Sequence, residues 1–179
     1  MSTTIQLHDK QFVPFIDADK IATSIATLAQ KIQNDYQDKN PLFVGVLNGS
    51  FLFVADLVRQ FDGDCEVSFI KMASYEGTST TGVVNELIGL KEDIKDRHVI
   101  ILEDIVDTGN TLEKLAELLE KDKPASIEIA TLLFKPNAYQ KTFPVNYVAM
   151  EVGNEFLVGY GLDYDGRGRN LKDIYIIKE

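Results

Sequence analysis

Residues 99–112 constrain the fold of this chain more than any other stretch. Residues 99–102 form an apolar run rich in β-branched side chains, which predicts a strand buried on both faces. Glu103 and Asp104 follow, at the point where we expect that strand to end. A small polar segment, residues 107–111, then precedes leucines that recur at helical spacing. The stretch therefore predicts a strand, a tight turn and a helix in succession.

The turn at residues 107–111 has the features of an anion-binding site. Backbone N–H groups converge at the start of a helix, where the helix dipole also favours negative charge. Gly109 can adopt a positive φ and lets a ligand approach the backbone, while Thr108 and Thr111 can donate hydrogen bonds from their hydroxyls. The turn therefore suits an anionic group such as phosphate.

Three carboxylates beside this turn conflict with that interpretation. Glu103, Asp104 and Asp107 would repel a phosphate group that bound alone, and two adjacent acids at a strand end are often only a solvated turn. The conflict disappears if a hard cation lies between acids and phosphate, because Mg²⁺ binds carboxylate, water and phosphate oxygens together. We therefore expect a magnesium-dependent site.

The rest of the chain alternates between helical and strand patterns. Asp17 predicts a helix N-cap. The expected helices cover residues 18–36, 51–61 and a segment from Leu112 to about 121–124. The expected strands cover residues 42–47, 65–73, 83–90, 126–134, 145–152 and 174–177, with 4–16 as a strand or extended arm. This alternation predicts an α/β fold, a single domain over residues 1–179, with a mostly parallel central sheet flanked by helices.

Charge and composition argue against several classes of protein. A formal net charge of -10 is unfavourable for a nucleic-acid-binding surface, and no apolar run reaches membrane-spanning length. The first residues lack the basic and apolar regions of a signal peptide. The single cysteine, Cys65, cannot form an intramolecular disulfide, which is typical of a reducing compartment. We therefore expect a cytoplasmic protein that binds neither nucleic acid nor membrane.

Chemically suggestive residues fall at the carboxyl ends of predicted strands. Asn48 and Gly49 follow one strand, Glu103 and Asp104 another, and Lys135 a third. Ligands of α/β sheets bind beyond these strand ends, so we expect one shared site. Residues 75–82 are rich in glycine and hydroxyl side chains and allow two interpretations, a solvated hairpin loop or a lid that excludes water.

Several motifs resemble those of a known family. Residues 103–111 resemble the phosphoribosyl pyrophosphate motif of type I phosphoribosyltransferases. Residues 47–50, Ser74 and Tyr75, Lys135, and 156–164 with Arg169 resemble hypoxanthine-guanine phosphoribosyltransferases, in the family's order. The resemblance implies a core over about residues 17–150 and a small hood formed by residues 1–16 and 151–179. It also implies purine salvage, the transfer of a phosphoribosyl group to hypoxanthine or guanine.

The resemblance implies a role for each motif. Asp107 resembles the proposed base that accepts the proton from purine N7. The residues expected to bind the ribose and its 5-phosphate are Glu103, Asp104, Asp107, Thr108, Gly109, Asn110 and Thr111. Those expected at the pyrophosphate are Asn48, Gly49 and Arg169, and those at Mg²⁺ are Glu103, Asp104 and Asp163. Ser74 and Tyr75 would begin the lid.

Purine recognition is implied for three further residues. Lys135 resembles the lysine that donates to the purine 6-oxygen, which favours an oxo over an amino group. Phe156 resembles the ring that stacks on the base, and the backbone of Leu157 resembles the group at the 2-position. The implied partners are small molecules, with a homodimer or homotetramer as the expected assembly.

Two positions depart from the family pattern and leave questions open. Asn48 stands where many members carry lysine, and whether the preceding peptide is cis is open. Leu157 replaces valine or isoleucine, which leaves the preference among hypoxanthine, guanine and xanthine open. Two alternative functions stay open. One is a regulator that senses phosphoribosyl pyrophosphate, and the other is a phosphoribosyltransferase that acts on adenine or a pyrimidine.

Overall fold

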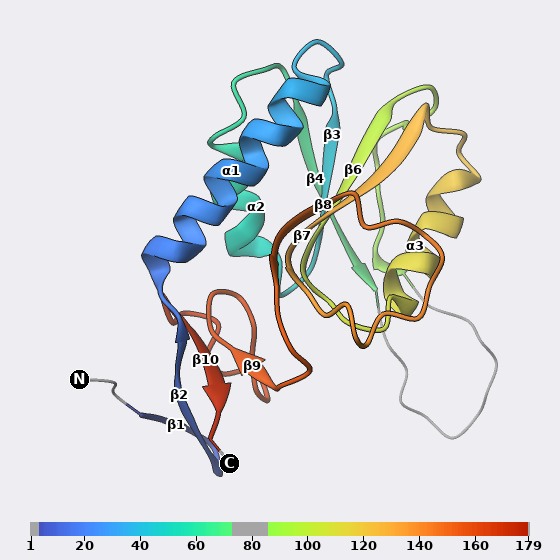
Figure 1. The fold of residues 1–179 in the computed structure, drawn as a ribbon. Coiled ribbons are helices and arrows are strands. Elements are labelled where there is room, and N and C mark those ends of the chain that lie inside the picture. The colour runs from blue at the N-terminus through green and yellow to red at the C-terminus, as the bar shows by residue number, and fades with distance from the viewer. Residues whose placement is uncertain (1–3, 73–85, 179) are drawn as a thin grey trace, which may run out of the picture.

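A computed structural model describes residues 4–72 and 86–178. Its larger sheet has the strand order β5-β4-β3-β6-β7-β8 (Figure 1). The five strands from β4 to β8 in this order are parallel, and β5 pairs antiparallel with β4. The strands are β3 Leu42–Val46, β4 Glu66–Met72, β5 Glu86–Ile88, β6 His98–Val106, β7 Ser126–Phe134 and β8 Tyr147–Glu151. The predicted α/β fold with a mostly parallel sheet is confirmed.

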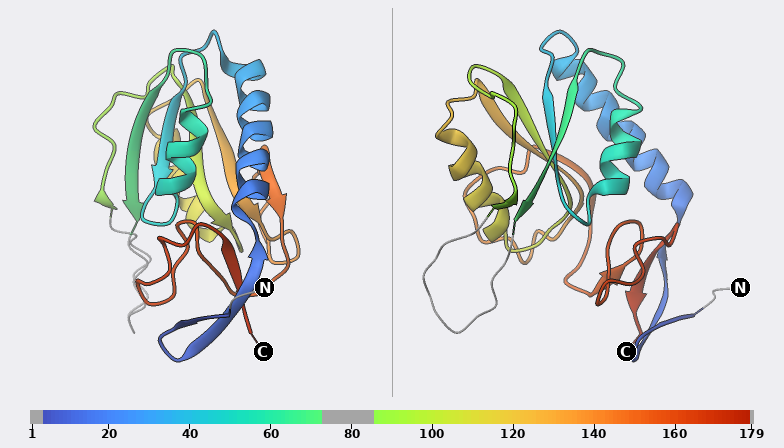
Figure 2. Two further views of the ribbon diagram at one scale, coloured as in Figure 1. Left: turned by 90° about the vertical axis from the view of Figure 1, so that its left-hand side faces the viewer. Right: turned by 180° about the vertical axis from the view of Figure 1, so that it is seen from behind.

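Helices cover both faces of this sheet (Figure 2). Helices α1, Ala18–Tyr36, and α2, Phe51–Val58, bury their apolar sides on one face, and α3, Asn110–Glu120, packs on the other. The Asp17 carboxylate caps α1, accepting a hydrogen bond from the Lys20 N–H at 2.8 Å. Helix α2 ends at Val58, before the predicted residue 61, because three-residue turns replace the α-helical hydrogen bonds there.

The order of the strands creates a crevice between β3 and β6. From β3 the chain first adds β4 and β5 on one side, and then crosses to place β6 on the other side of β3. Open α/β sheets bind ligands beyond the carboxyl ends of strands at such a reversal. The motifs that follow β3 and β6 therefore meet at the most favourable place in this fold for a ligand.

A second sheet, of order β1-β2-β10-β9, joins the two ends of the chain. Its strands are β1 Ile5–Leu7, β2 Lys10–Ile16, β9 Leu157–Val158 and β10 Ile174–Ile177, all antiparallel. It lies beside the carboxyl ends of the main parallel strands (Figures 1 and 2). The predicted hood of N- and C-terminal segments is thus confirmed, and the expected arm at residues 4–16 is a pair of strands.

The end of β6 differs from the sequence prediction. The strand continues past Glu103 and Asp104 to Val106, because the neighbouring β7 continues to pair with it, Glu103 opposite Thr131 and Val106 opposite Phe134. The two acids therefore lie within a strand, where successive side chains point to opposite faces. They cannot act as one pair at a solvated turn.

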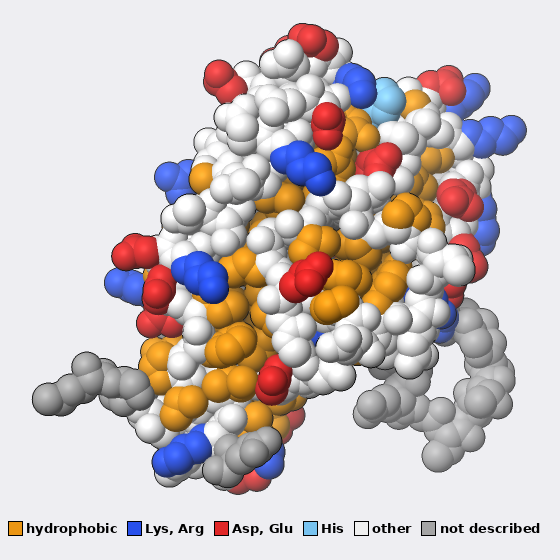
Figure 3. Space-filling view, in the orientation of Figure 1, with side chains coloured by type: hydrophobic (Ala, Val, Ile, Leu, Met, Phe, Trp, Pro, Cys, Tyr) orange, Lys and Arg blue, Asp and Glu red, His pale blue; other side chains and the backbone are white. Residues whose placement is uncertain are grey.

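The surface that carries α1 and β8 is mixed in character. Acidic and basic side chains are interspersed over it, and hydrophobic side chains gather around the edge strand β8 (Figure 3). Within the described ranges 4–72 and 86–178, the helices are all too short or too polar to cross a membrane.

Candidate active site

The ends of three neighbouring strands bring the predicted site residues together. Residues 47–50 follow β3, residues 103–109 include the end of β6 and the turn after it, and Lys135 follows β7. The Lys135 N–H donates to the Val106 carbonyl at 2.9 Å, which fixes the end of β7 against the end of β6. Asn48, Gly49 and Lys135 follow strand ends as predicted from the sequence, whereas Glu103 and Asp104 lie within the last part of β6.

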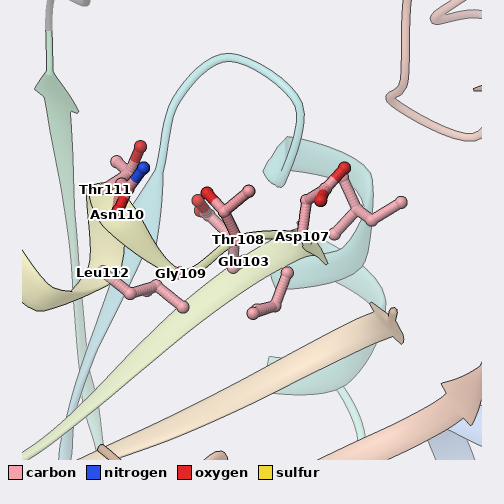
Figure 4. A pocket seen from close by; sticks show the side chains of 9 residues that line it. Glu103, Asp107, Thr108, Gly109, Asn110, Thr111 and Leu112 are labelled. Carbon is pink, nitrogen blue, oxygen red and sulfur yellow. The ribbon is translucent and has the colours of Figure 1, made fainter. Parts of the chain in front are cut away.

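A cavity of about 110 Å³ lies at the start of α3 (Figure 4). It is lined by Glu103 from β6, by residues 105–109, and by the first turn of α3, residues 110–112. Gly109 caps the helix with φ of 83°, a conformation that glycine adopts without strain. The cavity exceeds the roughly 10–15 Å³ that one water molecule needs. Backbone N–H groups at this helix start are available to donate to an anion in the cavity.

Asp104 points to the other side of β6, against the turn that follows β3. A Cβ atom on Gly49 would overlap its carboxylate, so a larger residue at this position would require Asp104 to move. The peptide bond between Leu47 and Asn48 is cis, which answers the question left open by the sequence. Burial raises the pKa of Asp104 to about 6, while backbone hydrogen bonds and the charge of Arg169 act to lower it.

Glu103 is buried, and its Oε2 atom has no hydrogen-bond partner within the described protein. Burial, and secondarily the charge of Asp104, raises its pKa well above the ordinary value. A buried polar atom without a partner is unusual in a folded protein and indicates a site completed by a ligand. A cation or a hydroxyl donor would satisfy this carboxylate.

Arg169 and Asp163 form an ion pair near Asp104. An Arg169 amino group donates to Asp163 Oδ1 at 2.7 Å, and the other donates to the Gly161 carbonyl at 2.7 Å. The charge of Asp163 acts to raise the pKa of Asp104. Over residues 4–72 and 86–178, three or more acidic, histidine or cysteine side chains nowhere cluster as a metal site would need.

This donor set fits Mg²⁺ only in company with a ligand. Mg²⁺ characteristically takes one or two carboxylates and fills its remaining positions with water and substrate phosphate oxygens. The buried, unpartnered Glu103 on one face of β6 and the carboxylate of Asp104 on the other each meet that requirement singly, whereas Asp163 is engaged by Arg169. An ion shared with a phosphorylated ligand therefore suits the site better than a closed protein cage.

Lys135, directly after β7, contacts both the turn after β6 and the segment that precedes Phe156. Its side chain is buried, and its Nζ atom lies 3.3 Å from Asp107 Oδ2 and 3.5 Å from the Asn154 carbonyl oxygen. Phe156 is 45% exposed, with its ring 5.8 Å from that of Tyr164. Phe156 is two residues after Asn154, whose carbonyl oxygen contacts the buried Lys135. Its exposed ring can stack on a flat heterocycle bound near this lysine.

Some contacts of the site were not predicted from the sequence. The side chains of Tyr139 and Lys141 pack behind Gly109, and Gly161 lies against the Gly49 carbonyl. No periodic pattern marks these residues, since each contact joins segments that are distant in sequence. Ser74 and Tyr75, the predicted start of the lid, lie outside the described residues.

Comparisons with known proteins agree with this geometry. Residues 16–165 match the model of the phosphoribosyl transferase domain family. The chain is 41% identical to hypoxanthine-guanine phosphoribosyltransferase of Streptococcus pneumoniae, over 92% of each chain. It is 44% identical to hypoxanthine phosphoribosyltransferase of Haemophilus influenzae, over 87% of this chain and 89% of that one.

Solved structures give the same result. A hypoxanthine phosphoribosyltransferase of Staphylococcus aureus superposes with a TM-score of 0.87 at 38% identity, covering 92% of this chain and 90% of the other. A hypoxanthine-guanine phosphoribosyltransferase of Bacillus anthracis superposes with a TM-score of 0.86 at 34% identity, covering 93% and 96%. The chain therefore belongs to the phosphoribosyltransferase family, in its hypoxanthine-guanine group.

Proposed function

We propose that this protein is a purine salvage enzyme that transfers the 5-phosphoribosyl group of phosphoribosyl pyrophosphate to hypoxanthine or guanine. The products are inosine or guanosine monophosphate and pyrophosphate. The observation that carries the proposal is the meeting of an anion cavity, a buried unpartnered carboxylate and a buried lysine in the carboxyl-terminal parts of the adjacent strands β6 and β7 and directly after them. Relatives named for this reaction at more than 40% identity support it.

The cavity at the start of α3 is the proposed site of the 5-phosphate. Residues 107–111 surround it, and the helix start offers N–H donors without a metal ion. Glu103 lines the same cavity, where its carboxylate would accept hydrogen bonds from ribose hydroxyls. The phosphate and the ribose would thus be held on the α3 side of β6.

The pyrophosphate is proposed to lie on the opposite side of β6. Asn48 and Gly49 offer backbone N–H groups there, and Arg169 can form charge-assisted hydrogen bonds to phosphate oxygens. Asp104, which faces this side of β6, would hold Mg²⁺ together with the pyrophosphate, and Asp163 would join it only after release from Arg169. When bound, Mg²⁺ would supply charge neutralisation on the leaving group.

The reaction is a displacement at the anomeric carbon of the ribose. Purine N9 forms the new bond to this carbon, the bond to pyrophosphate breaks, and its electron pair leaves with the pyrophosphate. The proton on N7 passes to the Asp107 carboxylate. Lys135, 3.3 Å from Asp107, would donate to the purine 6-oxygen, while Phe156 stacks on the base.

Steady-state assays with each base test this proposal. Hypoxanthine and guanine should be converted in the presence of Mg²⁺ and phosphoribosyl pyrophosphate, with adenine converted far more slowly because the ammonium of Lys135 disfavours an amino group. Xanthine and a pyrimidine complete the comparison. Absence of turnover with both 6-oxopurines would reject the proposal. The homodimer or homotetramer stays a prediction, which light scattering measures.

A further inference from the structure

A segment that follows β7 returns to the back of the proposed phosphate site. The N–H groups of Ala138 and Tyr139 donate to the Lys135 carbonyl at 3.1 and 3.2 Å, which turns the chain sharply after the strand. The Gln140 N–H then donates to the Thr108 carbonyl at 3.3 Å. Residues 139–141 are thus tied directly to the phosphate-binding turn at residues 107–111, and we name them the brace.

Two side chains of the brace pack against Gly109. A Cβ atom at Gly109 would lie 2.5 Å from Tyr139 Cε2 and 2.8 Å from Lys141 Cγ, so both side chains fill the space behind this residue. The Tyr139 ring is itself held, by a contact with the Phe134 ring at 5.3 Å and by its hydroxyl, which donates to the Phe143 carbonyl at 2.5 Å. The ring therefore supports Gly109 in its positive-φ conformation.

The brace also supplies a charge. Lys141 Nζ lies 2.6 Å from Glu113 Oε2, and both side chains are partly buried. Glu113 belongs to the first turn of α3, next to the N–H groups that would bind a phosphate. An unpaired carboxylate there would repel the phosphate and would compete with it for the positive end of the helix dipole. Lys141 removes this repulsion.

We propose that Tyr139 and Lys141 are positioning residues for the 5-phosphate. Tyr139 fixes the backbone of the phosphate-binding turn, and Lys141 neutralises Glu113. The inference rests on the proposed function, because it assumes that the anion is the 5-phosphate of phosphoribosyl pyrophosphate. It goes further in assigning roles to two residues outside the strand-end motifs.

A charge cycle on Lys141 and Glu113 tests the electrostatic part. Ribose 5-phosphate binding is measured by calorimetry for the wild type, Lys141→Met, Glu113→Gln and the double variant, with Lys121→Met at the far end of α3 as the matched control. Lys141→Met should weaken binding by about 3- to 10-fold, and the double variant should return to within about 2-fold of the wild type. Unchanged binding in Lys141→Met, or a double variant as weak as it, would overturn the proposal.

Kinetics of Tyr139 variants test the mechanical part. Tyr139→Ala should raise KM for phosphoribosyl pyrophosphate by about 10-fold, with KM for hypoxanthine within about 2-fold of the wild-type value, and Tyr139→Phe should restore most of the affinity because it keeps the ring. An equal rise in both KM values would mark general destabilisation and reject the role. The calorimetric cycle needs no turnover, so a failure of the proposed activity and a failure of the brace give different results.

Discussion

The carboxylate of Asp104 lies partly buried against the turn after β3, and burial raises its pKa to about 6 from the ordinary 3.8. Between these pH values the folded protein keeps a proton that the unfolded chain releases. The free energy of unfolding contributed by this group therefore falls as the pH rises from about 4 to about 6, and the loss is complete at higher pH. In the ligand-free protein, the buried charge of Asp104 therefore lowers the free energy of unfolding at neutral pH.

Asp104→Asn should consequently stabilise the ligand-free protein at pH 7.5, by up to about 3 kcal/mol, and have little effect at pH 4. Urea unfolding at several pH values, with Asp122→Asn in the exposed turn after α3 as control, measures this difference. Turnover should be lost in the same variant. If both proteins show the same dependence of stability on pH, the burial of the Asp104 charge is not what sets that dependence.

Asp107 is the second residue whose role can be isolated. Asp107→Asn keeps the shape of the side chain but removes the proton acceptor, so turnover should fall by about 100- to 10,000-fold while the Kd for phosphoribosyl pyrophosphate stays within a few fold. Single-turnover kinetics and calorimetry separate the two effects. Equal turnover in variant and wild type would mean that Asp107 serves only the structure of the turn.

Lys135 should act on the base instead of the sugar. Lys135→Met keeps a long side chain in the buried space but removes the donor to the purine 6-oxygen and the partner of Asp107. KM for hypoxanthine should rise by about 10- to 100-fold, and the preference for hypoxanthine over adenine should shrink. Competition assays between the two bases measure this, and an unchanged preference would exclude Lys135 from base recognition.

At the scale of elements, local patterns decided what the sequence could predict. Helix α1 and strand β7 have the predicted bounds, since the periodicity of the first and the unbroken apolar run of the second are each local signals. The end of β6 was predicted wrongly because Glu103 and Asp104 are kept in the strand by pairing with β7, a contact between distant segments. No local sequence pattern predicts that the brace, residues 139–141, packs against the phosphate-binding turn.

The candidate site follows the same rule. Its strand-end residues could be found because each follows an apolar strand directly, and parallel strands bring such ends together. That Glu103 and Asp104 serve opposite faces of β6 could not be found, because it depends on where the strand ends. The structure thus places Glu103 and Asp104 on opposite faces of β6, and the proposed division into a ribose-phosphate side and a pyrophosphate side rests on that placement.

At the scale of the whole molecule, the hood is attached to the core beside the site. The Tyr160 hydroxyl donates to Asp56 Oδ2 of α2 at 2.5 Å, and the Ala18 N–H donates to Asp173 Oδ1 at 2.8 Å. Gly161, the residue after Tyr160, lies against the backbone of Gly49. Contacts that hold the hood thus also determine the position of the proposed pyrophosphate turn.

The Tyr160–Asp56 hydrogen bond provides a test of this attachment. Burial, followed by the effect of Asp56, raises the pKa of Tyr160, so the hydroxyl stays a donor throughout the usual pH range. Tyr160→Phe should lower the free energy of unfolding by about 1–3 kcal/mol, because it leaves the partly buried Asp56 without this donor. It should also raise KM for phosphoribosyl pyrophosphate more than KM for hypoxanthine, since Gly161 would no longer be held firmly against Gly49.

Tyr164→Phe is the matched control for this variant. Its hydroxyl donates to Asp9 at 2.7 Å, within the hood and at an exposed position, so its loss should change stability less and leave both KM values unaltered. Urea unfolding and steady-state kinetics of the two variants give the comparison. Equal effects would show that attachment of the hood to α2 does not act on the site, and that Gly161 keeps its position against Gly49 through the backbone alone.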